Sequence, residues 1–299
     1  MLKEIIERAY PHKFDGEILY HYTNQDVVDI FAKSSSRLYC TKATELNDET
    51  EFNIGIERGL AYIEARSDPG VYKSVKQTLE LARDKGLWMP WILSFSSKGD
   101  DLNQWKGYVS QRDGGYSVGF DRKTLEFIIA QKTHEWQEVD CASGVPPPFV
   151  MYMFPCFYDK CDDIDKLLEL MFGRIIDEYL LIQKSYPAPE SLKRVATIIS
   201  MLYLFAGIYK HEAFKDENET RIVLQNQNPV IDQDVELVGF KHRIPLPGVP
   251  DLFQIKNCVV SIMRSPHGNR VAHDEHMVKL STEFGAKVKM CQSVLPYRG

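Results

Sequence analysis

Apolar residues recur along this chain at helical spacing in some segments and in short, nearly unbroken runs in others. Helical spacing predicts one helix through Phe52 and Ile63 and another over 74–85. Two longer apolar stretches predict helices at about 162–184 and 190–213, joined by a proline-containing loop as a helical hairpin. A last helix is expected near 270–284.

Short apolar runs between these helices predict strands. They lie at 18–22, 37–41, 91–96, 116–120, 134–141, 149–158, 219–225, 234–246, 252–263 and 286–293. Strands stand on both sides of the helical hairpin without strict alternation with helices. This order predicts an α+β fold, with a mixed or antiparallel sheet and flanking helices, over a doubly wound sheet.

Turn and cap residues mark where some of these elements begin. Thr23 opens a capping box before a short helix, and Asp101 and Asp121 each precede a further helix. A turn is expected at Leu46–Asp48, and Gly114-Gly115 is typical of a hairpin.

Length and composition are those of a globular protein. The 299 residues allow a large core, and we expect a single domain over 1–299 with 162–213 as a candidate helical insertion. Apolar residues make up 44% and charged residues 26% of the chain. The formal charge of −6 provides no general basic field, which argues against wholesale coating of nucleic acid.

No segment predicts a membrane or a secretory destination. The longest apolar run, Ala196–Tyr209, is too short to cross a bilayer and has Lys193 and Lys210 at its ends. The N-terminus lacks the apolar core of a secretory signal. The six cysteines have neither zinc-site nor disulfide spacing, so we expect reduced thiols in a cytoplasmic protein.

The segment Lys210–Arg221 carries the strongest chemical signal. Glu217 and Glu219 stand two residues apart, so in an extended segment both would point to the same side. Arg221, two residues further on, would supply a cation in the same row. The row fits either a solvated strand edge with an internal ion pair or a site that needs a fixed carboxylate.

Three earlier segments add polar and aromatic candidates near the ends of predicted elements. They are His21, Tyr22 and Thr23 in the first, Ser94 and Ser96 in the second, and Trp105, Tyr108 and Tyr116 in the third. A histidine beside Leu19 also fits a core position, and an aromatic pair at helical spacing usually packs in a core.

Motifs for common enzyme classes are absent. The sequence has no phosphate-binding loop, dinucleotide-binding motif, serine-hydrolase motif or zinc-protease motif. His273 and His276 share an H-x-x-H spacing on the last predicted helix, but no third ligand is indicated. We therefore expect a solvated helix face there and no metal site.

Taken in order, these segments resemble a bacterial and phage family called domain-of-unknown-function 2971. The shared motifs are YHYT at Tyr20–Thr23, LND at Leu46–Asp48, SFS…D…W..Y at Ser94–Tyr108, GY.(I/V)GF at Gly115–Phe120, KH..F..E.E.R at Lys210–Arg221 and S..PYR at Ser293–Arg298. The chain departs from the pattern at Glu49, where the family often has Pro, and at Ser265-Pro266, where Gly-Pro is common.

A looser resemblance links the HYT strand, the mid-chain Ser or Tyr element and the late strand Glu to the ADP-ribosyltransferase fold, whose enzymes hold NAD in a split sheet. It implies a split sheet here and roles for the candidates. His21 would contact the adenosine ribose with Tyr22 and Thr23 beside it, Ser94 or Ser96 would line the cleft, and Trp105, Tyr108 or Tyr116 would supply the aromatic contact to nicotinamide. Glu219 would be the catalytic acid, Glu217 would orient the acceptor, and Arg221 would hold Glu219.

The chemistry behind these roles is electrostatic. Departure of nicotinamide leaves positive charge on the sugar, and a fixed carboxylate stabilises that charge. The resulting hypothesis is an NAD-using transferase or NAD glycohydrolase, a toxin-like effector in bacterial conflict or phage defence. Its partners would be a nucleotide and a protein or nucleic-acid acceptor.

Two alternatives remain open at this point. One is a non-catalytic module that binds a nucleotide or nucleic acid through Lys210, His211, Lys215 and Arg221. The other is a metal-dependent nuclease, whose ligands would be Asp216, Glu217 and Glu219 with Asp48 or Asp101.

Overall fold

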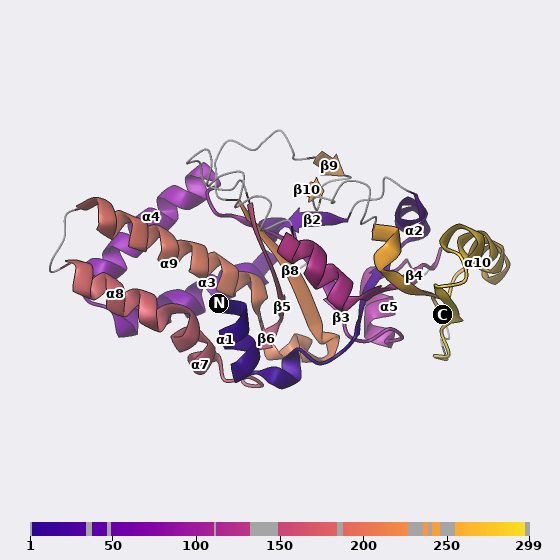
Figure 1. Cartoon of the computed structure of the whole chain (residues 1–299), viewed down its shortest axis with the longest axis horizontal. Coiled ribbons are helices and arrows are strands. Elements are labelled where there is room, and N and C mark those ends of the chain that lie inside the picture. Colours follow the sequence, from indigo (N-terminus) through magenta and orange to yellow (C-terminus); the bar gives the residue numbers. More distant parts are fainter. Residues whose placement is uncertain are drawn as a thin grey trace.

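The computed structural model describes residues 2–33, 38–46, 49–110, 112–131, 149–183, 188–226, 236–238, 241–245 and 255–296. The fold is α+β, as the sequence predicts: a mostly antiparallel sheet lies between a group of helices at one end of the molecule and helix α10 (Arg270–Phe284) at the other (Figure 1). The predicted strand at 134–141 lies outside the described residues.

The main sheet follows the order β12-β11-β4-β1-β3-β2-β10-β9, and β8 joins β3 to β5 beside this path. Its strands are β1 (Ile18–Thr23), β2 (Tyr39–Lys42), β3 (Pro90–Ser96), β4 (Tyr116–Asp121), β5 (Phe149–Pro155), β8 (Glu219–Asn226), β9 (Glu236–Val238), β10 (Lys241–Pro245), β11 (Val259–Arg264) and β12 (Lys289–Gln292). Only β11 and β12 run parallel within it, while β6 (Phe157–Tyr158) and β7 (Tyr209–Lys210) form a separate parallel pair in the described chain.

The sheet divides at β3, which confirms the predicted split. On one side β3 pairs with β8 over its whole length, from Pro90 to Ser96. On the other side it meets β1 only at Ser96 and β2 only at Trp91 and Ile92. The middle of β3, around Ser94, therefore has a strand neighbour on one side and an opening on the other.

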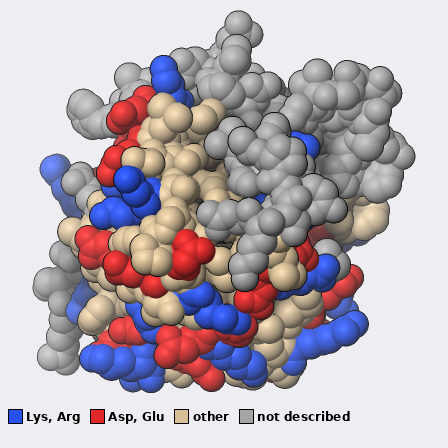
Figure 2. Space-filling view, turned by 90° about the vertical axis from the view of Figure 1, so that its left-hand side faces the viewer, with Lys and Arg blue, Asp and Glu red and all other residues tan. Residues whose placement is uncertain are grey.

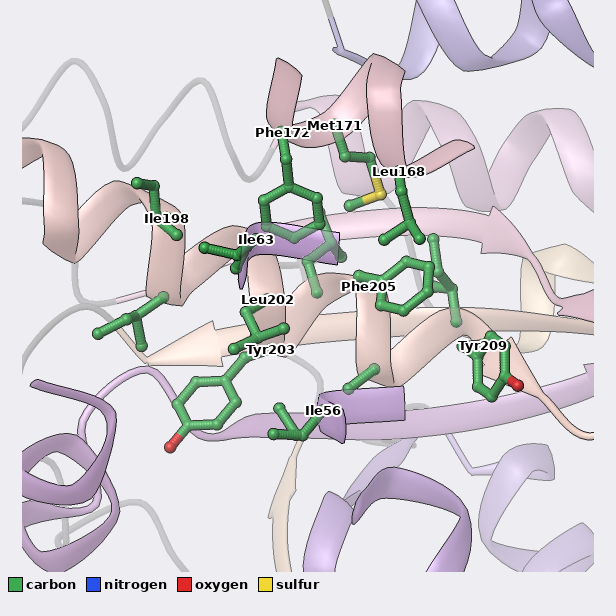
Figure 3. Close-up of a cluster of buried hydrophobic side chains, with 14 of the residues drawn as sticks. Ile56, Ile63, Leu168, Met171, Phe172, Ile198, Leu202, Tyr203, Phe205 and Tyr209 are labelled. Atoms are coloured by element: carbon green, nitrogen blue, oxygen red, sulfur yellow. The ribbon is translucent and has the colours of Figure 1, made fainter. Parts of the chain in front are cut away.

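The predicted helical hairpin is present and belongs to the larger of two main cores. It consists of α7 (Ile164–Leu168), the π-helix η3 (Glu169–Gly173), α8 (Arg174–Gln183) and α9 (Ala188–Ile208). These helices pack with α3 (Glu49–Arg66) and α4 (Pro69–Lys85) in a cluster that includes Ile56, Leu202 and Phe205 (Figure 3). The second helix ends at Ile208 and not near 213, because Tyr209 and Lys210 pair with β6 as strand β7.

A second core lies around β1, β4 and β11. It is covered by α2 (Gln25–Ala32), a helix at 122–131 and α10. A small third cluster surrounds Trp105 on α5 (Leu102–Tyr108). The remaining described elements are α1 (Leu2–Ala9) and the 3-10 helices η1 (Pro11–Lys13), η2 (Ala43–Glu45), η4 (Glu212–Glu217) and η5 (Ile255–Cys258).

Two predicted details differ from the structure, and a third is not tested by it. Asn24, and not Thr23, caps α2, because its side chain accepts a hydrogen bond from the Val27 amide at 3.1 Å. The first part of the strand predicted at 252–263 is helical over Ile255–Cys258. The turn predicted at Leu46–Asp48 lies largely outside the described residues.

The prediction of a solvated H-x-x-H face is wrong. Both histidines are buried on α10, with exposed fractions of 3% for His273 and 7% for His276. His276 contacts the Tyr116 hydroxyl through Nδ1 at 2.7 Å and Asp29 Oδ1 through Nε2 at 3.0 Å, so it joins α10 to β4 and α2.

The surface charge agrees with a composition that provides no general basic field. On the face that Figure 2 shows, basic and acidic side chains are interspersed and neither forms a continuous patch. Among the helices in the described part of the chain, none is long and apolar enough to cross a membrane.

Candidate functional site

A cavity of about 650 Å³ lies at the opening of the split sheet, within the volume range of ligand pockets. Strand β1 and helix α2 supply part of its lining through His21, Thr23 and Val27. Strand β3 contributes Ser94, and an ionic cluster from α3, β7, η4 and β8 completes it. The cavity thus joins an apolar part to a charged part.

His21 reaches across the opening from β1 to β3. Its Nδ1 lies 3.0 Å from the carbonyl oxygen of Ser94. A carbonyl oxygen only accepts hydrogen bonds, so Nδ1 carries a proton and donates it in this contact. This contact occupies the place where a neighbouring strand would otherwise pair with β3.

The charged part is centred on Glu219, the first residue of β8. Arg221 donates to Glu219 Oε1 through Nε at 2.8 Å and to Oε2 through Nη2 at 3.1 Å, while Lys210 donates to Oε2 at 2.6 Å. The predicted ion pair between Glu219 and Arg221 is confirmed. A carboxylate has about four acceptor positions, so Glu219 keeps about one, on Oε1, for a further donor.

Glu217 occupies a different element from the one expected. It is the last residue of η4 and not part of the strand, because Asn218 takes a left-handed conformation with φ 45° before β8 begins. Asparagine tolerates this conformation better than most residues. Glu217 still reaches the cluster, since its Oε2 accepts a hydrogen bond from Lys210 at 2.8 Å.

Glu51 on α3 completes the cluster and was missed by the sequence reasoning. Its Oε1 lies 2.6 Å from Arg221 Nη2, and its Oε2 lies 3.7 Å from Lys210 Nζ. It is 7% exposed and lines the cavity. The sequence places Glu51 directly before Phe52, which lies on the apolar face of a predicted helix. This position was the available indication that Glu51 could be buried.

The two buried acids have opposite protonation preferences. Burial alone would raise the pKa of Glu219, but Arg221 and Lys210 outweigh it and lower that pKa to about 2. Burial raises the pKa of Glu51 above its ordinary value, and the same two cations offset this only in part. Burial would lower the pKa of Lys210, but Glu219 and Glu51 hold it above its ordinary value.

Tyr108 lies at the accessible edge of the cavity. It is 42% exposed, and its hydroxyl is 3.5 Å from Glu217 Oε2. Burial of the hydroxyl, followed by the nearby charges of Glu219 and Glu217, raises the pKa of Tyr108. Among the predicted aromatic residues, it is the one placed to contact a ligand.

The structure brings most of the predicted site residues to this cavity. They are His21, Tyr22, Thr23, Ser94, Tyr108, Glu217, Glu219 and Arg221. Tyr22 also has a structural role, because its hydroxyl donates to the Lys98 carbonyl at 2.8 Å and accepts from the Asp101 amide at 3.1 Å.

Three predicted residues do not line the cavity. The Ser96 hydroxyl donates to the Glu217 carbonyl at 2.7 Å and so fixes the end of η4. Trp105 is fully buried and donates to Asp100 at 2.8 Å. Tyr116 is fully buried against His276, so it is not placed to stack on a ligand in this cavity.

Of the carboxylates considered for a nuclease, Glu217 and Glu219 both bind Lys210, whereas the structure does not place Asp101 or Asp48 with them. Asp101 caps α5 by accepting from the amides of Asn103 and Gln104, and Asp48 lies outside the described residues. The described part of the chain holds no group of three His, Cys, Asp or Glu side chains with metal-site geometry.

Comparisons with known proteins add one match. None of the curated proteins and none of the solved structures matches the chain, and nothing in the comparisons supports the resemblance to ADP-ribosyltransferases. One protein family matches the stretch from α5 to β8. This stretch contains Tyr108, Lys210 and Glu219 but not His21 or Glu51. Over residues 104–222 the chain is similar to the family described as "Protein of unknown function (DUF2971)".

Proposed function

We propose that the cavity binds a ribose-bearing nucleotide and that the chain cleaves or transfers at its glycosidic carbon, with NAD as the substrate. The observation that carries this proposal is the convergence of His21 and Glu219 on one cavity from distant parts of the sequence. A cavity of about 650 Å³ accommodates a ligand of this class.

The contacts of Glu219 support a role in holding a ribose hydroxyl. Arg221 and Lys210 fix the carboxylate from two directions and keep it ionised, and one acceptor position remains. A fixed anion next to the sugar would stabilise positive charge that develops as the nicotinamide leaves. Arg221 is then a positioning residue, which acts through Glu219.

The opposed pKa directions of Glu51 and Glu219 support chemistry over binding alone. Neighbouring acids whose environments push their pKa values apart are typical of acid–base sites. Glu219 would remain ionised while Glu51 exchanges a proton more readily. Glu217, on the more accessible side, is the candidate for orienting an acceptor.

A second candidate is a module that binds the nucleotide without cleaving it. It is favoured by the pairing of Glu219 with two cations, which reduces the negative charge offered to a reacting sugar. Two of the four basic residues considered for a nucleic-acid contact, Lys210 and Arg221, are 2% and 3% exposed and cannot reach a phosphate backbone, so a nucleic acid would meet only His211 and Lys215 there.

Incubation with NAD and chromatographic detection of nicotinamide tests the proposal. We expect release of nicotinamide, and a loss of roughly 100-fold or more in Glu219→Gln, because a preorganised group at the reacting centre contributes at least that factor. Glu64→Gln, an exposed position on α3, is the control and should keep full activity.

Two further measurements keep this test decisive. Circular dichroism shows whether Glu219→Gln is folded, and His21→Ala provides a second variant that should weaken NAD binding without touching the ionic cluster. Binding without nicotinamide release would support the second candidate. Unchanged cleavage in Glu219→Gln would contradict the assignment of that residue.

A further inference from the structure

The charged part of the cavity has one more anion than cations. Among the described lining residues, the carboxylates are Glu51, Glu217 and Glu219, and the cations are Lys210 and Arg221. An uncompensated charge in a buried site is costly, so either a proton or a cationic ligand has to balance it.

Both cations are already shared between carboxylates. Arg221 Nη2 lies 2.6 Å from Glu51 Oε1 and 3.1 Å from Glu219 Oε2. Lys210 Nζ lies 2.6 Å from Glu219, 2.8 Å from Glu217 and 3.7 Å from Glu51. Neither cation has a carboxylate to itself, so the local excess of negative charge is not removed by rearranging these pairs.

Glu51 is the carboxylate on which a balancing proton would reside. Glu219 receives three charged hydrogen bonds that favour its ionised form, and the Glu217 side chain is 19% exposed, so water helps to stabilise its charge. The Glu51 side chain is 8% exposed, and its neighbouring ionisable groups are Arg221, Lys210, Glu219 and Cys156. Its raised pKa agrees with this assignment.

We propose that Glu51 carries a proton while the cavity is empty and releases it to solvent when a cationic ring of the ligand enters. This inference rests on the proposed function and specifies it further: the positively charged nicotinamide end of NAD enters the acidic part of the cavity. Glu51 then acts as a specificity-determining residue, because the ligand's charge replaces the proton's charge.

The inference distinguishes two nearly identical ligands. Oxidised and reduced NAD have the same phosphates, riboses and adenine, but only the oxidised nicotinamide ring is cationic. A carbocyclic NAD, in which the glycosidic bond cannot be cleaved, allows both forms to be compared at equilibrium. We expect the oxidised analogue to bind at least about tenfold more tightly than the reduced one, the factor that corresponds to one pKa unit.

Isothermal titration calorimetry in buffers with different ionisation enthalpies measures the proton directly. With wild type, the oxidised analogue should release a substantial fraction of a proton and the reduced analogue almost none. Glu51→Gln should abolish this release and narrow the preference for the oxidised form. Glu57→Gln, an exposed substitution on the same helix, is the matched control and should behave as wild type.

A measurement on wild type alone guards against a misfolded variant. If a proton leaves on binding, affinity for the oxidised analogue must increase as the pH rises through the pKa of Glu51. Equal affinity for the two analogues, or a flat pH profile, overturns the inference while NAD cleavage still stands or falls by its own assay. Failure of both analogues to bind overturns this inference and the proposed substrate together.

Discussion

Lys210 shows how much one side chain contributes to the cavity. Its ammonium group contacts Glu219, Glu217 and Glu51, and the residue is only 2% exposed. The sequence predicted the pairing of Glu219 with Arg221, because their spacing of two places them on one strand face. It could not predict Lys210 and Glu51 as partners, since their contacts depend on how α9 ends and how α3 packs.

Replacement of this lysine therefore has a large expected cost. Lys210→Met should lower the free energy of unfolding by about 3–5 kcal/mol, because it leaves buried carboxylates without a shared cation. Denaturant unfolding followed by circular dichroism measures the change.

Lys160→Met is the matched control for this prediction. Lys160 pairs with Glu212 at 2.7 Å, but its side chain is 70% exposed, so its loss should change the free energy of unfolding far less than the loss of Lys210. Similar losses for the two variants would show that the buried cluster adds no special stability.

At the scale of elements, α2 and α10 are joined through one carboxylate. Asp29 on α2 lies 3.0 Å from His276 Nε2 and 2.8 Å from Lys279 Nζ, both on α10. The polar run around His273 and His276 suggested a solvated face, because the sequence does not show which helix face packs against the sheet. Helix positions were predictable from periodicity, but this orientation depends on tertiary contacts with β4.

The contacts of Asp29 with His276 and Lys279 predict that the protein loses stability in acid. Burial alone would raise the pKa of Asp29, but hydrogen bonds from Lys279 and His276 outweigh it and leave the pKa below its ordinary value. Because the pKa of Asp29 is lower in the folded than in the unfolded protein, the contact stabilises the fold at pH values above the ordinary carboxyl pKa. This contribution disappears as the pH falls below that value and through the lowered pKa of Asp29.

Thermal unfolding from neutral pH down to about pH 3 tests this prediction. Asp29→Asn should be less stable than wild type at neutral pH, and the difference should shrink in acid. Asp26→Asn, on the exposed face of the same helix, should follow the wild-type pH profile. A constant difference for Asp29→Asn across the range would contradict the prediction.

At the scale of the whole molecule, the larger core and the cavity meet where α3 passes α9. A Cβ atom on Gly55 would lie 2.7 Å from the Cα of Ala206, so the two helices approach too closely there for any side chain at this position. On Gly59 the close contact would be with the end of the Leu202 side chain, and Phe205 Cδ1 would lie at an ordinary 3.5 Å. The close approach places Glu51, one turn before Gly55, beside the ionic cluster.

These two glycines predict different costs. Gly55→Ala should destabilise the fold by roughly 1–3 kcal/mol, because backbone atoms must separate. Gly59→Ala should be nearly neutral, since the helix-propensity gain of about 1 kcal/mol offsets a shift of Leu202. Urea unfolding compares the two, and equal effects would contradict the helix packing described.

Sequence reasoning was most reliable for the overall architecture. The helical hairpin and, to within one residue, the ends of β1, β3 and β8 followed from periodicity and turn residues. The split in the sheet was implied by the resemblance to the ADP-ribosyltransferase fold and not by periodicity. The cavity required additional information, because its lining combines β1 and β2, which do not pair with each other, with side chains from α3 and η4. Residues such as Tyr116 and Trp105 matched a motif but turned out to hold the scaffold together.

The opening beside the middle of β3 also affects how this protein can change. Where two strands are paired, a substitution in one must suit its partner, but β1 and β2 are separated at the opening and do not constrain each other there. Lining residues outside the strands, such as Val27 on α2, can therefore vary with little effect on the ladder, while Ser94 and Glu219 remain tied to neighbouring strands. Ligand preference can diverge on one side of the gap while the side with the ionic cluster is retained.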